Sequence, residues 1–352
     1  MTFHRRIALS AVLTALLCGA AAGPAGAVTA EVSGTTLRVT GGQAGERIGV
    51  SLRTLDEGRI YTVFATDALT ASTIDVVPGP GCVPPRPDGL NGEPGTAICA
   101  APPIQAVEIL GLGGGDDLGI EPERPGFDQM VAPVRVDGGS GSDKIEVDTN
   151  PSRASGGPGN DRIGRRCGPG RARLTGGAGN DVIAACDSGT PDRAAGPVKV
   201  ISGGPGQDSL DGSAGRDRMT GGPGIDGVYG RAGRDRLDGG GGADQLLGDK
   251  GNDRLFGRGG KDGLVDHQGD NVLIGAAGDD ALFTLSAVAR GEGSSRVVGG
   301  VGDDFFYIRN RRRDRASGGA GEDSAVADGI DVMRSIESSL TRIPQIPGVP
   351  RF

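Results

Sequence analysis

Between residues 203 and 283 the chain places one aliphatic residue at every ninth position, among glycines and polar residues. These aliphatic residues are Leu210, Met219, Val228, Leu237, Leu246, Leu255, Leu264, Leu273 and Leu282. Each is the middle of a three-residue segment, and one inward side chain between two outward ones is typical of a short strand. The six residues between strands are glycine-rich and predict a tight turn. Two such units predict one coil, and stacked coils predict parallel strands about 4.8 Å apart.

Sparser copies of the nine-residue unit lie on both sides of this block. They begin at Gly111, Gly138, Gly156, Gly176, Gly299 and Gly318. The first four starts and Gly203 are separated by 27, 18, 20 and 27 residues. Because most of these steps are multiples of nine, we expect one continuous solenoid in which some half-coils have lost the turn motif.

The residues before the repeats predict further strands. The segments "VTAEVSGTTLRVTG", "RIGVSLRT", "GRIYTVFAT" and "TIDVVPG" are rich in Val, Ile and Thr and are separated by turn residues. They precede the Pro- and Gly-rich segment "PGPGCVPPRPDGLNGEPGTAICAAPP", whose composition predicts a long loop. The chain is therefore expected to be all-β, with an amino-terminal β-rich cap.

The first residues, "MTFHRRIALSAVLTALLCGAAAGPAGA", have the pattern of a secretory signal peptide. A basic start precedes an apolar run, and Ala25-Gly26-Ala27 forms a small-x-small cleavage site. A membrane anchor is the alternative, but the run is short for a span of about 20 residues. We expect a secreted protein with no membrane span once the signal is removed.

The expected organisation follows from these segments. It comprises a signal peptide at 1–27, a β-rich cap with a Cys-bracketed loop at 28–110, degenerate repeats at 111–202, nine tandem repeats at 203–283, degenerate repeats and a closing cap at 284–340, and a tail at 341–352.

Four cysteines follow the signal peptide, and an even number in an exported chain favours disulfides over free thiols. The spacings suggest the pairs Cys82–Cys99 and Cys167–Cys186. The first pair would close the Pro-rich loop at its base, and the second would join neighbouring coils.

Composition and net charge exclude some classes of protein and partner. The 352 residues include 68 glycines, no tryptophan and only 3% aromatics, which is unusual for a compact globular core. The formal net charge is −8, so nucleic acid is a poor partner. The acidic residues recur at regular spacing, which suits an array of cation ligands better than an acidic tail.

Position six of the tandem unit is Asp in all units but one, where Asn271 replaces it. Aspartates eighteen residues apart should share one edge of the solenoid, which gives two columns. Two carboxylates about 5 Å apart repel by roughly 3 kcal/mol at an effective dielectric of 20, so we expect a cation between rungs. The donors are all oxygen, and His267 is the only histidine after the signal peptide, which favours calcium over zinc or copper.

The units "GGPGQDSLD", "GGAGNDVIA" and "GGPGNDRIG" resemble the RTX, or haemolysin-type, calcium-binding nonapeptide repeat. This resemblance implies a right-handed parallel β-roll with several Ca²⁺ ions in its turns. Carried over residue by residue, it implies metal ligands at Asp116, Asp143, Asp161, Asp181, Asp208, Asp217, Asp226, Asp235, Asp244, Asp253, Asp262, Asp280, Asp304 and Asp323.

Some units depart from the family pattern. Arg216, Arg234 and Lys261 occupy position five, where a basic group should weaken a cation site or form a salt bridge with the Asp. The unit at 266–274 lacks its first two glycines and its ligand Asp, so we expect the column through Asp253 to be interrupted there. Fewer filled sites than motifs are expected. The amino-terminal signal also differs from the family's usual carboxy-terminal export signal.

The sequence carries no HExxH or GxSxG motif, so we assign no catalytic residue. The segment "FFYIRNRRRDR" could contact an anion or an acidic polysaccharide, but a solvated loop with Phe306 in the core is the simpler interpretation. We expect a non-enzymatic calcium-binding protein with a structural or adhesive extracellular role. The alternative is a lyase or epimerase acting on carbohydrate at a solenoid face.

Overall fold

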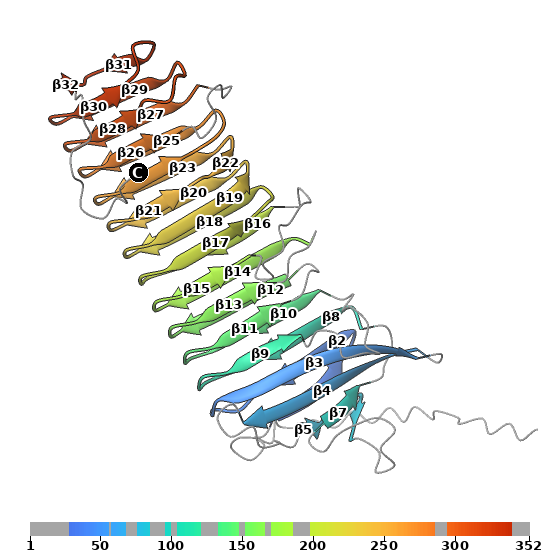
Figure 1. Cartoon of the computed structure of the whole chain (residues 1–352). Coiled ribbons are helices and arrows are strands. Elements are labelled where there is room, and N and C mark those ends of the chain that lie inside the picture. The colour runs from blue at the N-terminus through green and yellow to red at the C-terminus, as the bar shows by residue number, and fades with distance from the viewer. Residues whose placement is uncertain are drawn as a thin grey trace, which may run out of the picture.

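The computed structural model describes residues 28–55, 58–67, 76–84, 96–99, 104–120, 133–147, 152–165, 170–185, 198–285 and 294–339. These residues form strands and turns and contain no helix. Figure 1 shows the strands stacked along one axis, from an amino-terminal end in blue to a carboxy-terminal end in red. The stack is a parallel β-roll closed at its first end by a small group of antiparallel strands.

One sheet runs the length of the roll. Its strands, in spatial order, are β5 (Val76–Pro78), β1 (Val28–Ser33), β2 (Thr36–Thr40), β8 (Ala106–Leu110), β10 (Val134–Asp137), β12 (Ser152–Pro158), β14 (Ala172–Ala178), β16 (Lys199–Ser202), β18 (Asp217–Pro223), β20 (Arg236–Gly241), β23 (Arg254–Gly259), β25 (Val272–Ala277), β27 (Arg296–Val301), β29 (Arg315–Ala320) and β31 (Val332–Arg334). From β2 onward every neighbouring pair is parallel.

The second sheet faces the first. Its strands are β6 (Cys82–Val83), β7 (Thr96–Cys99), β4 (Gly58–Asp67), β3 (Glu46–Leu55), β9 (Asp117–Ile120), β11 (Lys144–Val147), β13 (Arg162–Arg165), β15 (Val182–Ala184), β17 (Ser209–Ser213), β19 (Gly227–Gly233), β21 (Gln245–Leu247), β24 (Gly263–Asp266), β26 (Ala281–Thr284), β28 (Phe305–Ile308), β30 (Ser324–Ala327) and β32 (Ser338–Ser339). The short β22 (Lys250–Gly251) pairs with the far end of β19.

The core is the row of aliphatic residues predicted from the sequence. Leu237 pairs with Leu255 across β20 and β23, and Leu246 pairs with Leu264 across β21 and β24. These side chains are at most 1% exposed. In the tandem repeats, strands such as β20 and β21 each bury one aliphatic side chain, so a coil there adds only one such residue per sheet. The β-roll prediction is therefore confirmed.

The solenoid is continuous, as expected, but a step of 27 residues makes one coil and not three half-coils. Val134 pairs directly with Val107, and Leu210 pairs directly with Ile183, each at a separation of 27. All the turns that begin at Gly111, Gly138, Gly156, Gly176 and Gly203 therefore lie on one edge. The extra residues of each step fall within 121–132 and 186–197, which lie outside the described residues.

The amino-terminal strands cover the first coil. β1 and β2 form an antiparallel hairpin, and β3 pairs with β4 along ten residue pairs. β4 then pairs with β7, and β7 with β6, both antiparallel. A disulfide joins Cys82 to Cys99 across β6 and β7, as predicted. Cys167 and Cys186 lie outside the described residues.

In the turns with the nonapeptide pattern, position four is glycine, and successive turns touch there. A Cβ on Gly224 would lie 1.5 Å from the carbonyl oxygen of Gly206 in the preceding coil. Position two is less restricted. Arg231 and Arg258 adopt φ of 79° and 86° there, while Gly222 has 134°. The change in φ admits a side chain, at a cost in backbone strain.

Truncating one core residue should test the thinness of this core. We expect Leu237→Ala to lower the free energy of unfolding by about 2–5 kcal/mol, because the neighbouring coils cannot close the cavity. Val301→Ala, at a side chain that is 63% exposed, should change it by less than about 0.5 kcal/mol. Urea unfolding of both variants in calcium measures the difference. Equal losses would contradict the assigned core.

Candidate metal sites in the stacked turns

A column of buried carboxylates follows one edge of the roll. The backbone N–H of each position-six Asp donates to Oδ1 of the corresponding Asp in the next coil, at 2.8–3.0 Å. The column contains Asp116, Asp143, Asp161, Asp181, Asp208, Asp226, Asp244, Asp262, Asp280, Asp304 and Asp323. This bond fixes one coil against the next.

The second oxygen of each carboxylate in this column has no hydrogen-bond partner. Every one of these Oδ2 atoms is buried, and the residues are at most 3% exposed. Each Oδ2 points into the space left by the glycine at position one. A Cβ on Gly203, for example, would lie 2.1 Å from Oδ2 of Asp208. A buried carboxylate oxygen without a partner is costly, so this arrangement fits a bound cation.

Burial raises the pKa of these carboxyl groups. Desolvation is the main cause, and neighbouring carboxylates add to it, while the N–H bonds to Oδ1 oppose it. The pKa of Asp116 and of Asp244 rises to about 7, and that of Asp235 to about 8. In the ion-free protein these carboxyl groups therefore keep their protons to a higher pH than free aspartates do.

A shorter column follows the other edge. Lys199, Asp217, Asp235 and Asp253 each donate an N–H to the carboxylate or amide oxygen one coil further on, at 2.7–3.3 Å. The last acceptor is Asn271, so this run of hydrogen bonds reaches the unit where we expected the column to be interrupted.

Asp217 differs from the other predicted ligands. Its Oδ2 accepts hydrogen bonds from the backbone N–H and the hydroxyl of Ser213, at 2.7 and 2.9 Å. Burial of the Asp217 carboxyl group raises its pKa, and this is the largest effect. The Ser213 hydrogen bonds and the ammonium of Lys199, a residue that is 0% exposed, lower the pKa in part. Ser213 occupies position two of the turn, so one substitution satisfies the oxygen that other turns leave unpaired.

Several members of the columns were missed from the sequence, among them Lys199 and Asp331, which accepts the N–H of Asp314 at 3.0 Å. Glu46 donates its N–H to Oδ1 of Asp116 at 2.7 Å, and Glu337 accepts from the N–H of Asp323 at 2.8 Å. Asp314 accepts the N–H of Ser295 at 2.7 Å on the other edge. The sequence did contain a signal for Glu46. It lies in "GGQAGERIG" at 41–49, a unit with Glu in place of Asp at position six and Ala in place of Gly at position four.

The basic residues at position five do not enter the Asp columns. Arg216, Arg234 and Lys261 are exposed, and within the described chain none of them forms an ion pair with a position-six Asp. Two position-two arginines form contacts between coils instead. Arg231 binds Asp211, and Arg258 binds Asp238, each across a separation of 20 residues.

The arginine-rich segment is part of the roll. Phe306 is 0% exposed in the core, as expected, and it lies in β28, which ends at Ile308. Arg312 is only 7% exposed, and its Nη1 donates to the carbonyl of Gly269 at 3.1 Å. The idea of a fully solvated loop is thus wrong for Arg312, which binds an earlier coil.

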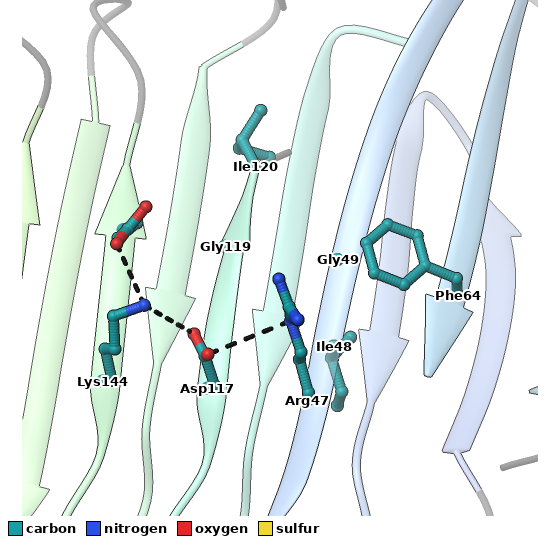
Figure 2. Close-up of a pocket in the computed structure, with 9 residues that line it drawn as sticks. Arg47, Ile48, Gly49, Phe64, Asp117, Gly119, Ile120 and Lys144 are labelled. Atoms are coloured by element: carbon teal, nitrogen blue, oxygen red, sulfur yellow. Dashed lines mark hydrogen bonds and ion pairs between the residues drawn. The ribbon is translucent and has the colours of Figure 1, made fainter. Parts of the chain in front are cut away.

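A pocket lies on the outer face where the cap meets the first coils (Figure 2). Phe64 covers Gly49, where a Cβ would lie 2.0 Å from the ring. Beside it, Asp117 pairs with Arg47 and Lys144, at 3.9 and 3.5 Å, and Lys144 also pairs with Glu146 at 3.1 Å. These charges balance one another along β3, β9 and β11, so the pocket joins the cap to the roll.

The donor set determines which ion can fit. Within the residues that the structure describes, no three His, Cys, Asp or Glu side chains converge at one point. Any ion would therefore draw many of its ligands from backbone carbonyls, which suits Ca²⁺ with its six to eight oxygen ligands. No helix in the described part of the chain is long and apolar enough to cross a membrane.

Comparison with known proteins identifies the repeats. A family model described as the RTX calcium-binding nonapeptide repeat (4 copies) matches residues 137–164, 168–185, 200–228, 229–264 and 256–286. No curated protein sequence matches the chain. The matched ranges contain turns of both carboxylate columns.

The raised pKa values predict how pH acts on the ion-free protein. An Asp whose pKa is raised in the folded state binds protons more tightly when folded, so folding is favoured below that pKa. In metal-free buffer the free energy of unfolding should therefore fall as pH rises from about 4 to about 8, the range between the ordinary value and those of Asp116, Asp235 and Asp244. Thermal melting across this range tests it. A melting temperature that rises with pH would contradict the assignment.

Two variants should separate Asp217 from Asp235. We expect Asp235→Asn to remove one bound Ca²⁺ per chain, because its unpaired Oδ2 becomes an amide. Asp217→Asn should leave the count unchanged, because Ser213 already satisfies that oxygen. Both keep the Oδ1 acceptor. Equilibrium dialysis with metal analysis gives the counts, and a loss in Asp217→Asn would show that this residue also binds an ion.

Proposed function

Starting from the RTX calcium-binding repeats that the chain carries in a β-roll, we propose that the protein is exported and non-enzymatic, and that Ca²⁺ in its turns folds and stabilises the roll. Its role outside the cell is structural or adhesive. The observation that carries the proposal is the row of buried, unpartnered Oδ2 atoms along the stacked turns.

The proposed ligands are the position-six aspartates whose Oδ2 is unpaired. They comprise Asp116, Asp143, Asp161, Asp181, Asp208, Asp226, Asp235, Asp244, Asp253, Asp262, Asp280, Asp304 and Asp323. Backbone carbonyls of the glycine-rich turns complete the shells. Asp217 is left out of this set, because its carboxylate is already hydrogen-bonded on both oxygens.

Export rests on the signal-peptide pattern at 1–27, which lies outside the described residues. The proposed calcium binding also favours export, because extracellular calcium-binding modules bind Ca²⁺ with dissociation constants of about 10⁻⁴–10⁻³ M. The competing proposal of a carbohydrate-active enzyme requires a cluster of unpaired ionisable groups on one face. In the pocket of Figure 2 the charged side chains are instead paired with one another.

Calcium should be required for folding. Above about pH 8, where the raised pKa values no longer keep the buried carboxyl groups protonated, we expect the exported chain to lack strand signal in chelator. In millimolar Ca²⁺ it should gain that signal and a smaller hydrodynamic radius, because ion binding relieves the unpaired carboxylates. Mg²⁺ should do this poorly, since it requires a tighter octahedral shell. Circular dichroism and size-exclusion chromatography measure both. The same spectrum and melting temperature in chelator and in calcium would refute the proposal, and turnover of uronate polymers would favour the enzyme.

A further inference from the structure

The turn at 266–271 departs from its neighbours at two positions at once. In the other turns with the nonapeptide pattern from Gly111 onward, position one is Gly and position six is Asp. Here Asp266 occupies position one and Asn271 occupies position six. The two positions touch within a turn, because a Cβ on Gly275 would lie 2.1 Å from Oδ2 of Asp280. A side chain at position one therefore requires a change at position six.

The amide of Asn271 makes the pair compatible. Its Oδ1 accepts the N–H of Asp253 at 2.9 Å, as an Asp does in other rungs. Its Nδ2 donates to Oδ1 of Asp266 at 2.6 Å, where a second carboxylate would repel. The N–H of Gln268 donates to the same Oδ1 at 3.3 Å. These two hydrogen bonds orient the Asp266 carboxylate and leave its Oδ2 for another partner.

The free oxygen of Asp266 points at the turn of the preceding coil. Asp266 is 1% exposed, and its Oδ2 has no hydrogen-bond partner. This atom lies 2.1 Å from the point where a Cβ of Gly248 would be, and Oδ2 of Asp253 lies 3.0 Å from the same point. Asp253 is 0% exposed, and its Oδ2 is also unpartnered. Two buried carboxylate oxygens thus face the same space, which is open because Gly248 has no side chain.

The neighbouring basic side chains do not pair with these two carboxylates. Nδ1 of His267 lies 3.7 Å from Oδ1 of Asp249, which is a different carboxylate. Lys250 is exposed. In the part of the chain that the structure describes, no basic side chain forms an ion pair with Asp253 or Asp266. Hard oxygen donors around a buried space with two formal negative charges select a divalent cation such as Ca²⁺.

We propose that Asp253 and Asp266 bind a Ca²⁺ ion between the turns 248–253 and 266–271, with the second carboxylate supplied from position one of the turn instead of position six. The proposal rests on the proposed calcium-binding function. In this proposal the unit at 266–274, which departs most from the motif, still binds an ion, with the ligand at position one instead of position six. The column on this edge therefore keeps a bound ion where the sequence motif is lost.

Counting ions on the full exported chain tests the proposal. Equilibrium dialysis against Ca²⁺ with metal analysis should give one ion fewer per chain for Asp266→Asn than for the unaltered protein. The matched control is Asp270→Asn, which removes the same charge from the same turn. Asp270 is exposed, and its Oδ1 accepts the N–H of Ser294 at 2.6 Å, which an Asn can also do. The control should keep the full count.

A swap of positions provides the second arm. Asp266→Gly should also lose one ion, and Asp266→Gly combined with Asn271→Asp should restore the count by recreating the usual turn. Asn271→Asp alone should add no ion. If the turn is simply empty, Asp266→Asn keeps the full count and Asn271→Asp alone adds an ion, which overturns the proposal. If the unaltered chain binds no Ca²⁺, the proposed function itself fails. Restoration by the double variant also shows that the loss in the single variant is not misfolding.

Discussion

The roll depends on a buried carboxylate that is hydrogen-bonded on one oxygen only. Oδ1 accepts an N–H from the preceding coil and so sets the register, while Oδ2 is left without a partner. Taking a carboxylate out of water costs several kcal/mol unless a charge compensates it. The group that aligns the coils therefore also makes the fold depend on a cation. Glycine at position one follows from the same contact, since a Cβ at Gly239 would lie 2.4 Å from Oδ2 of Asp244.

Much of this architecture could be predicted from the sequence, because a repeat of nine residues determines both the inward position and the edge of each Asp. Leu246 and Leu264 pair as the period requires. The predictions that failed involved residues whose neighbours lie outside the repeat. A step of 27 residues equals three repeat lengths in the sequence but makes one coil in the structure. The role of Ser213 depends on a side-chain hydrogen bond to Asp217, which no spacing rule contains.

The two edges of the roll differ in their dependence on charge. One column of side chains runs from Glu46 to Glu337, the length of the stack. On the other edge, Ala172 occupies the register that Lys199 and then Asp217 take in the next coils. The early coils are thus held by one column of carboxylates and by their apolar core. The coils that contain Asp217, Asp235 and Asp253 carry both columns. These coils lie in the middle of the roll, so removal of calcium should act most strongly there.

The ends of the stack pose a different problem, because an open parallel sheet exposes unpaired N–H and C=O groups that can recruit other chains. At the first coil the chain changes from parallel to antiparallel pairing, through β1 with β2 and β3 with β4. The disulfide between Cys82 and Cys99 closes the outermost pair of strands, β6 and β7. Such a cap does not depend on the number of coils beneath it. The repeats can therefore vary in length and in ion content while the end of the roll stays protected by ordinary hairpins.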